Sequence, residues 1–231
     1  MHLEILSTEQ IQLLPILSQF KKEYYMVGGT AIALHIGHRE SIDFDLFKNT
    51  NIRKKVIYEK LKNVDYKVSF ADYNQVNMLS NGVKITFFSF PYQIPLNSKL
   101  EDFLKMPDLL TLGAMKAFAL GRRTKWKDYV DLYFILKYHF SVKQISDRAI
   151  EIFKEEFIAK QFIAQLGYFK GINYDEEVTY LIPNPPTEQE VQDFLINVAL
   201  KGCSIKIFTQ FYMLPSFFGL SLQKFNPKSI K

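Results

Sequence analysis

The chain has 231 residues, 48% hydrophobic and 15% aromatic, which is enough for a packed core in one large or two modest domains. Its net charge of +5 is compatible with nucleotide or nucleic acid partners but does not establish them. Without a long apolar run or a signal segment the protein is expected to be cytoplasmic and not membrane-bound, and a single Cys203 excludes a disulfide framework or a cysteine-rich zinc site.

Helix and strand patterns mix in the first ninety residues. A helix is expected over residues 8–19, with Pro15 interrupting or bending it. A short β-prone run over residues 24–27 ends at a pair of glycines. The next helix is expected over residues 30–36, where Gly37 can terminate it.

Residues 41–47 alternate apolar and polar side chains, as a strand with one buried face does. The opposite face of this strand carries Asp43 and Asp45. The apolar face carries Ile42, Phe44 and Leu46. A helix and three strands are expected next, near residues 52–62, 65–70, 74–79 and 82–90. Together these elements predict an α/β fold around one mixed sheet.

The pattern changes after Pro91 and Pro95, where strand signals largely vanish. Helical periodicity takes over near residues 107–120, 126–138, 146–157 and 187–200. We therefore expect an α/β domain over residues 1–97 and a mainly helical C-terminal domain over residues 98–231. The tail from Cys203 onward is apolar and aromatic without clear periodicity, and its packing stays open.

Gly28, Gly29 and Thr30 stand where the first strand passes into a helix. Glycines let a backbone approach a phosphate closely, while the helix N-terminus and the threonine hydroxyl offer hydrogen-bond donors to the anion. A phosphate cradle is therefore one interpretation. Paired glycines also mark tight turns, and that alternative stays open from these residues alone.

Asp43 and Asp45 are two residues apart on an expected strand, so both carboxylates emerge on one face. Like charges this close repel each other, and a shared divalent cation relieves the repulsion. Mg²⁺, or Mn²⁺ in its place, takes oxygen ligands from one or two carboxylates together with substrate phosphates. The pair therefore predicts a metal site for in-line displacement at phosphorus, the alternative being the solvent face of an amphipathic strand.

The two motifs together resemble a known signature, in which a strand, Gly-Gly-Thr and a helix precede an Asp-x-Asp strand, here fourteen residues after Gly29. This order is similar to that of the DNA polymerase β-like nucleotidyltransferase superfamily. The finer sequence VGGTAIALHIGHRESIDFDLF, with the later KAFALGRRTKWKDYVDLYFIL, resembles the AbiEii/AbiGii-type nucleotidyltransferase toxins of bacterial toxin–antitoxin systems. The resemblance spans roughly residues 24–138.

The resemblance implies an α/β (α+β) nucleotidyltransferase fold with a mixed sheet, in which the helical half completes the active-site cleft. It assigns nucleotide triphosphate binding to Gly28, Gly29 and Thr30. It assigns metal binding, and with it a catalytic role, to Asp43 and Asp45.

A lysine and an Asp-x-x-Asp helix complete the family pattern. Lys116 is implied to contact nucleotide phosphate and to be catalytic; without the resemblance it would be a lysine snorkelling from an apolar helix face. Asp128 and Asp131 lie three residues apart on one helix face, and the resemblance implies that either completes the catalytic site. Alternatively, Asp128 stabilises the helix N-terminus and Asp131 pairs with Lys127.

Arg39 and Ser41 lead into the aspartate strand and are further candidates for nucleotide phosphate contact. One position departs from the superfamily, which often has a third carboxylate on a later strand. Thr86 stands there, and a hydroxyl is not a general base at neutral pH. The attacking group is then activated by metal alone, or by Asp128 or Asp131, or the enzyme is impaired.

The expected reaction is metal-dependent transfer of a nucleoside monophosphate from an NTP to an acceptor. The toxin resemblance implies an RNA acceptor, the 3′ end of tRNA, and an antitoxin protein partner in a type IV-like system. A basic cluster suits an RNA backbone: Arg122, Arg123, Lys125 and Lys127. Two alternatives stay open: transfer to a small molecule, as in antibiotic-modifying enzymes of the superfamily, and nucleotide binding without turnover.

Overall fold

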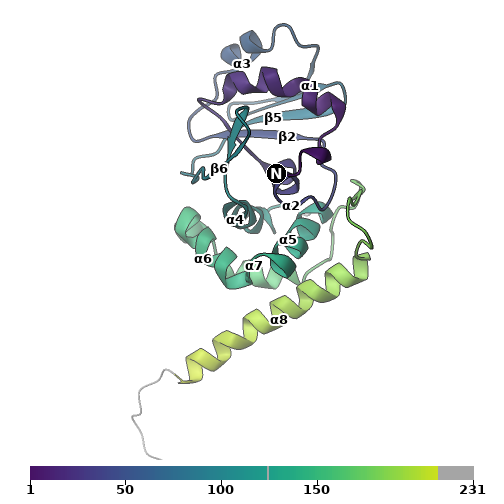
Figure 1. Ribbon diagram of the computed structural model, residues 1–231. Helices are drawn as coiled ribbons and strands as arrows, with labels where there is room; N and C mark the ends of the chain where they lie inside the picture. The colour runs from purple at the N-terminus through teal and green to yellow at the C-terminus, as the bar shows by residue number, and fades with distance from the viewer. Residues whose placement is uncertain (124, 213–231) are drawn as a thin grey trace, which may run out of the picture.

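The computed structural model describes residues 1–123 and 125–212, with side chains up to residue 202. A sheet with helices above it lies on a layer of further helices, and the last helix projects away from both layers (Figure 1). The sheet has seven strands in the order β3-β4-β5-β2-β1-β7-β6. The strands are β1 (Tyr25–Val27), β2 (Phe44–Lys48), β3 (Lys67–Ala71), β4 (Gln75–Ser80), β5 (Val83–Ser89), β6 (Ser98–Leu100) and β7 (Leu104–Met106).

The described helices divide between the two sides of the sheet and the helical layer. They are α1 (Thr8–Leu17), α2 (Gly28–Ile36), α3 (Lys54–Lys60), α4 (Leu109–Ala119), α5 (Trp126–Tyr138), α6 (Val142–Phe153), α7 (Ala159–Leu166) and α8 (Glu188–Tyr212). Short 3₁₀ turns occupy Leu3–Ile5, Ser18–Phe20 and Lys154–Glu156. Figure 1 shows α1 and α3 on one side of the sheet and α2, α4 and α5 on the other.

The register of the central strands brings three distant segments to one place. β1 runs antiparallel to β2, with Val27 opposite Asp45, so the end of β1 meets the start of β2. β2 runs parallel to β5, and Asp45 is opposite Thr86. The turn at Gly28, which follows Val27, therefore lies beside the aspartate and the threonine.

The two faces of the sheet differ because side chains alternate along each strand. One face is buried and mainly apolar, and carries Phe44, Leu46, Val76, Met78, Ile85 and Phe87. The rings of Phe20 and Tyr24 pack on Phe87, with centroids 4.8 and 5.3 Å away. Asp45 of β2 and Thr86 of β5 lie on the other face, toward α4.

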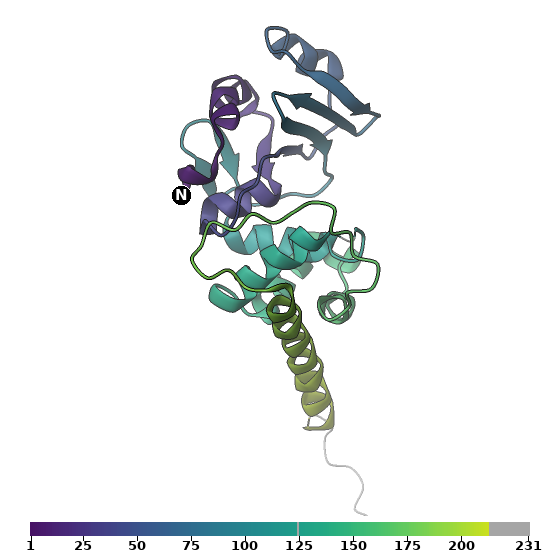
Figure 2. The same ribbon diagram turned by 90° about the vertical axis from the view of Figure 1, so that its right-hand side faces the viewer.

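The connection between α7 and α8 returns to the start of the aspartate segment. Figure 2 shows it running back across the helical layer toward the sheet. The backbone N–H of Glu40 donates to the carbonyl of Thr179 at 2.9 Å, and that of Leu181 donates to the carbonyl of His38 at 3.1 Å. These bonds fix the chain between α2 and β2 from a segment about 140 residues later in the sequence.

Strand β2 begins at Phe44, three residues later than expected, so Asp43 lies in the segment just before it. Ile42 is 53% exposed. The prediction that Ile42 shares the buried face of Phe44 and Leu46 was therefore wrong, because pairing with β1 ends where α2 begins at Gly28. The predicted helix end is confirmed: Gly37 adopts a left-handed conformation at the C-cap of α2, with φ +65°.

Two short strands follow the expected end of the sheet. β7 pairs in parallel with β1, and β6 pairs antiparallel with β7, so the sheet reaches Met106 and the helical layer begins at Leu109. The division into units at residue 97 stays a prediction, but residues 98–106 belong to the sheet. Each of these strands is only three residues long and contains an exposed lysine, so the sequence pattern does not indicate a strand there.

The remaining differences concern helix limits. α1 continues through Pro15 and ends at Leu17, and α7 was not expected. The tail beginning at Cys203 continues α8 as far as Tyr212, and its last part, residues 213–231, lies outside the described residues. In the part of the chain that the structure describes, no helix combines the length and the apolar character needed to cross a membrane.

Candidate active site

Asp45 lies directly against the backbone of Gly28. A Cβ placed on Gly28 would be 2.1 Å from Asp45 Oδ2, and the φ of Gly28 is +81°. Any other residue would meet the carboxylate and would also be strained in this conformation. Glycine is therefore required here to leave room for the aspartate, whatever else it contacts.

Asp43 and Asp45 carry the negative charge of the site. Among the described residues, neither carboxylate forms an ion pair. Burial, followed by the charge of Asp45, raises the pKa of Asp43. Burial likewise raises the pKa of Asp45, although Arg123 and Lys84 oppose it and the Thr86 hydroxyl donates a hydrogen bond. Neither carboxylate is paired with a cation and the pKa values of both are raised, which is the condition that a bound cation relieves.

The two aspartates fit a hard divalent cation that also takes ligands from elsewhere. Within residues 1–123 and 125–212, no group of three or more His, Cys, Asp or Glu side chains is arranged to hold a metal ion. Mg²⁺ accepts one or two carboxylates and completes its shell with water and substrate phosphate oxygens. The donor set of Asp43 and Asp45 therefore suits an ion that arrives with a nucleotide.

Thr30 and Ser41 hold the aspartate segment in place. Thr30 is 1% exposed, and its hydroxyl lies within hydrogen-bond distance of the backbone carbonyls of Ser41 and Asp43 and of the Ser41 hydroxyl. The Gln10 side-chain amide also donates to the carbonyl of Ser41, at 3.0 Å. The visible role of Thr30 is thus to position Asp43, and its contact with phosphate stays a prediction.

Gly29 makes room for Arg39. A Cβ on Gly29 would lie 2.6 Å from Arg39 Nη2 and 3.0 Å from Ser41 Oγ. Arg39 is 2% exposed, and its Nε and Nη2 donate to the two oxygens of Asp131 at 2.8 and 3.0 Å. Its guanidinium is therefore bound to a buried carboxylate, and it does not line the cavity in which a phosphate would lie.

Asp131 is the centre of a buried network. Its side chain has no exposure, and its oxygens accept hydrogen bonds from Arg39 and from His38 Nε2, the latter at 2.8 Å. Lys116 Nζ lies 2.8 Å from Asp131 Oδ2. Burial would raise the pKa of Asp131, but Arg39 and Lys116 outweigh it and hold the pKa well below its ordinary value. The alternative pairing of Asp131 with Lys127 was wrong, because Lys127 pairs with Glu176.

Asp128 extends the same network. Both of its oxygens accept from Arg123, at 2.7 and 3.0 Å, and Lys116 Nζ donates to its Oδ1. Burial opposes ionisation, but Lys116 and Arg123 lower the pKa of Asp128. Lys116 is thus held between two ionised carboxylates, Asp128 and Asp131, and its position beside the sheet is fixed.

A cavity of about 530 Å³ opens between the polar face of the sheet and α4. Of the candidates from the sequence, Gly28, Asp45, Thr86 and Lys116 line it. The remainder stand around this cavity without lining it: Gly29, Thr30, Arg39, Ser41, Asp43, Asp128 and Asp131. The structure therefore brings the candidates together, some in the wall of the cavity and the others in the segments around it.

Lys84 is a cavity residue that the sequence analysis missed. It precedes Thr86 by two positions on β5, so the two share a face, and both line the cavity. In the described structure its ammonium forms no ion pair, yet it lies close enough to lower the pKa values of Asp43 and Asp45. The alternation in VKITFFS could have identified it once Thr86 was singled out.

Three of the four cations in the basic cluster after α4 form ion pairs with acidic residues of the chain. Arg123 pairs with Asp128, while Lys125 and Lys127 pair with Glu176. The Arg122 guanidinium lies over the Phe118 ring, 3.7 Å from its centroid. Arg122 and Arg123 also line the cavity beside Asp45, whereas Lys125 and Lys127 do not.

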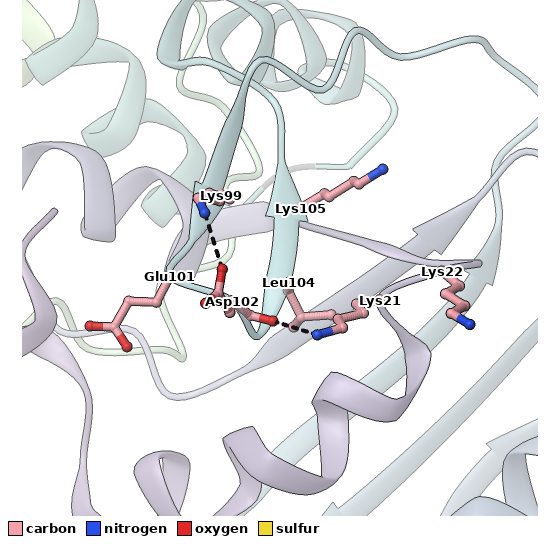
Figure 3. Close-up of a pocket in the computed structure, with 7 residues that line it drawn as sticks. All are labelled: Lys21, Lys22, Lys99, Glu101, Asp102, Leu104 and Lys105. Atoms are coloured by element: carbon pink, nitrogen blue, oxygen red, sulfur yellow. Dashed lines mark hydrogen bonds and ion pairs between the residues drawn. The ribbon is translucent and has the colours of Figure 1, made fainter.

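A second cavity, of about 410 Å³, lies beyond the other end of β1 (Figure 3). Its lysines come from the turn before β1 and from the β6–β7 hairpin: Lys21, Lys22, Lys99 and Lys105. Lys99 pairs with the Asp102 carboxylate at 3.1 Å, and Lys21 donates to the Asp102 carbonyl at 3.1 Å. It contains none of the candidate residues from the sequence.

Comparison with known proteins gives a family match. The family model described as nucleotidyl transferase AbiEii toxin, type IV TA system, matches residues 12–200. An uncharacterized protein of Aquifex aeolicus is 28% identical over 190 residues, which cover 74% of this chain and 84% of that protein.

The chain is also similar to solved structures. MenT4, a nucleotidyltransferase toxin from Mycobacterium tuberculosis, has a TM-score of 0.50 at 11% identity over 82% of this chain and 80% of that one. JHP933 from Helicobacter pylori has a TM-score of 0.49 at 14% identity over 89% and 99% of the two chains. The mixed sheet and the MenT4 likeness confirm the expected α/β nucleotidyltransferase fold.

Proposed function

The chain belongs to the AbiEii family of nucleotidyltransferase toxins, and on this premise we propose that it transfers a nucleoside monophosphate from an NTP to RNA, using a divalent cation held by Asp43 and Asp45. The chain is a nucleotidyltransferase, and membership of a toxin family implies a nucleotide substrate and an antitoxin partner. The cation, the RNA acceptor, a type IV mode of neutralisation and a cytoplasmic site of action are parts of the proposal.

One observation carries the metal assignment. Asp43 and Asp45 lack ion-pair partners in the described structure, whereas Asp128 and Asp131 are both saturated by cations. The burial that raises the pKa values of Asp43 and Asp45 makes them costly to ionise without a cation. A bound Mg²⁺ would neutralise triphosphate charge and polarise the reacting phosphorus.

The cavity cations would hold the nucleotide phosphates. Lys116 lines the cavity. Its ammonium is held there by ion pairs with Asp128 and Asp131, neither of which lines the cavity. Lys84 reaches the cavity from β5 without an ion-pair partner among the described residues. We therefore assign triphosphate contact to Lys84 and Lys116, in addition to the backbone at Gly28.

The attacking hydroxyl has no protein base on α5. All oxygens of Asp128 and Asp131 accept hydrogen bonds from cations or His38, and the pKa values of both are lowered. Thr86 is a hydroxyl that donates to Asp45. In the proposed step the acceptor oxygen bonds to the α-phosphorus, the bond to pyrophosphate breaks, and the acceptor proton leaves to water.

The acceptor assignment rests on the toxin family and not on a basic surface. An RNA 3′ end, and that of tRNA in particular, presents the hydroxyl that such a transfer needs. Because Lys125 and Lys127 already pair with Glu176, RNA contact by this cluster would require exchange of those ion pairs for phosphate. Transfer to a small molecule and nucleotide binding without turnover are the competing outcomes.

The test is incubation with Mg²⁺, each α-labelled NTP in turn and total tRNA, followed by separation of labelled RNA. Asp43→Asn and Asp45→Asn are the site variants, and the exposed Asp65→Asn is the matched control. The proposal expects label on RNA with the natural chain and with Asp65→Asn only. Label that persists in both site variants would refute the metal assignment, and nucleotide binding without pyrophosphate release would favour binding without turnover.

A further inference from the structure

Aromatic side chains line the cavity beside Asp45. They come from β2, β5, the segment after β5 and α4, and we call them the aromatic wall: Phe47, Phe88, Phe90, Tyr92 and Phe118. We propose that the aromatic wall binds the nucleobase of the donor NTP whose phosphates lie at Asp45. This inference rests on the proposed function and adds to it a second subsite of the same cavity.

The sheet register sets two adjacent rows on the cavity face. Asp45 and Thr86 are opposite each other in the first row, and Phe47 and Phe88 are opposite each other in the second. Successive residues on one face are separated by about 6.8 Å along a strand. The aromatic row therefore lies next to the row that contains the carboxylate of Asp45. A nucleotide has the same order, with charged phosphates at one end and an aromatic base at the other.

Neighbouring rings of the aromatic wall contact one another, but they do not cover each other completely. The Phe47 ring centroid lies 5.0 Å from that of Phe88 and 5.4 Å from that of Phe90. Tyr92 follows, with its centroid 4.8 Å from that of Phe90. All four rings line the cavity, and all four are only partly buried. Their remaining exposed surface is available for a planar ligand.

The opposite side of the cavity is formed by α4. Leu112 and Met115 supply apolar surface there, and Lys116 follows on the same helix. A base inserted between these side chains and the rings would be covered on both faces, with its phosphates directed to Lys116. Base–aromatic stacking tolerates any base because each has a π-face, so the wall predicts affinity more than base selectivity.

The experiment measures binding apart from turnover. The full chain is titrated calorimetrically with Mg²⁺ and α,β-methylene analogues of the four NTPs, and separately with inorganic tripolyphosphate. The variants are Phe88→Ala and Phe88→Leu, where the second keeps apolar bulk but removes the ring. Phe70→Ala is the matched control, because Phe70 is 47% exposed on β3 and does not line the cavity.

We expect the natural chain to bind the tightest-binding of the four NTP analogues at least tenfold more tightly than tripolyphosphate. Phe88→Ala should weaken analogue binding about tenfold and Phe88→Leu by a smaller factor. Tripolyphosphate binding should stay unchanged in both, and Phe70→Ala should match the natural chain. Equal affinity of the natural chain for analogue and tripolyphosphate would overturn the inference, as would unchanged analogue binding by Phe88→Ala with normal thermal unfolding.

A third titration separates the donor base from the acceptor base. A short single-stranded oligoribonucleotide replaces the analogue, and loss of its binding alone in Phe88→Ala would assign the wall to the acceptor and overturn the inference. Failure of the proposed function has a different signature. Analogue binding that depends on Phe88, in a chain that transfers no label to RNA, would support the base subsite and refute RNA transfer.

Discussion

Arg39 and Asp131 are joined by two hydrogen bonds, from Nε and Nη2 to the two carboxylate oxygens, although 92 residues separate them in the sequence. This pair connects the segment before β2 with the middle of α5. It also holds the carboxylate that fixes Lys116. The sheet side and the helical side of the active site are therefore locked to each other through one aspartate.

Asp131→Asn should strongly destabilise the protein. The change leaves Arg39 and Lys116 buried with less compensating charge, and breaking a buried pair in this way costs roughly 3–5 kcal/mol. Urea unfolding monitored by circular dichroism measures the loss. Asp147→Asn is the matched control, since Asp147 pairs with Lys143 on an exposed helix face and such pairs contribute about 0–1 kcal/mol. Equal losses in the two variants would contradict a structural role for the network.

The same aspartate should govern the acid limb of the stability curve. The pKa of Asp131 is held well below its ordinary value of 3.8, so the unfolded chain binds the proton first as the pH falls. Its stabilisation is complete above about pH 4 and is lost below it. The free energy of unfolding measured from pH 5 to pH 2 should fall less steeply in Asp131→Asn than in the natural chain. Parallel curves would show that Asp131 titrates normally.

Gly28→Ala should disrupt the proposed metal site at Asp43 and Asp45. The added methyl group would collide with Asp45 Oδ2 and displace the carboxylate. Gly82→Ala is a close control, because Gly82 has a similar φ of +79° but nothing lies within 4 Å of its Cβ position. Both variants carry the backbone strain of roughly 1–2 kcal/mol. Only Gly28→Ala should lose the Mg²⁺-dependent rise in thermal unfolding temperature and the transfer activity.

Asp45→Asn should stabilise the metal-free protein at neutral pH. Because burial raises the pKa of Asp45, its ionised form opposes folding there, and this penalty diminishes as the pH falls and the folded state takes up the proton. Thermal melts with and without Mg²⁺ check both halves of the prediction. The natural chain should gain about 2.7 kcal/mol at 100 times its Kd for Mg²⁺, and the variant nothing. A variant that melts lower without metal, or still responds to Mg²⁺, would contradict the assignment.

Lys84→Ala should weaken NTP binding without affecting the fold. Its ammonium has no ion pair to lose among the described residues, and it faces the aspartates from β5. The KM for NTP should rise about tenfold, as expected when one charged contact worth roughly 1.5 kcal/mol is removed. Lys67→Ala, on the exposed strand β3, serves as the control. An unchanged KM in Lys84→Ala would exclude Lys84 from phosphate contact.

The local part of the site could be predicted from the sequence. The sequence placed the paired glycines at the junction of a strand and a helix and Asp45 on the polar side of an alternating strand, as the structure has them. It did not predict that Asp45 lies against Gly28, and it placed Asp43 in the strand, although β2 begins one residue later. The helix over residues 126–138 was also predicted with its observed limits. Both depend on periodicity or turn chemistry that acts within a few residues.

The partners of these residues could not be predicted in the same way. Nothing near Arg39 or Asp131 in the sequence indicates that they meet, because their contact depends on how α5 packs against α2. Asp131 has Lys127 one helical turn away, yet that lysine turns to Glu176 instead. Alternation along β5 places Lys84 on the same face as Thr86, but only the register between β5 and β2 shows that this face meets Asp45. Long-range packing decides these cases and leaves no periodic signal.

The backbone hydrogen bonds that join Thr179 and Leu181 to the segment before β2 also have a consequence for shortened chains. An N-terminal fragment ending at residue 97 would contain Gly28, Gly29, Asp43 and Asp45. It would lack Asp131 and the returning segment that anchor Arg39 and its neighbours. Such a fragment therefore could not hold the segment before β2 as the longer chain does, even though it contains both aspartates of the candidate site.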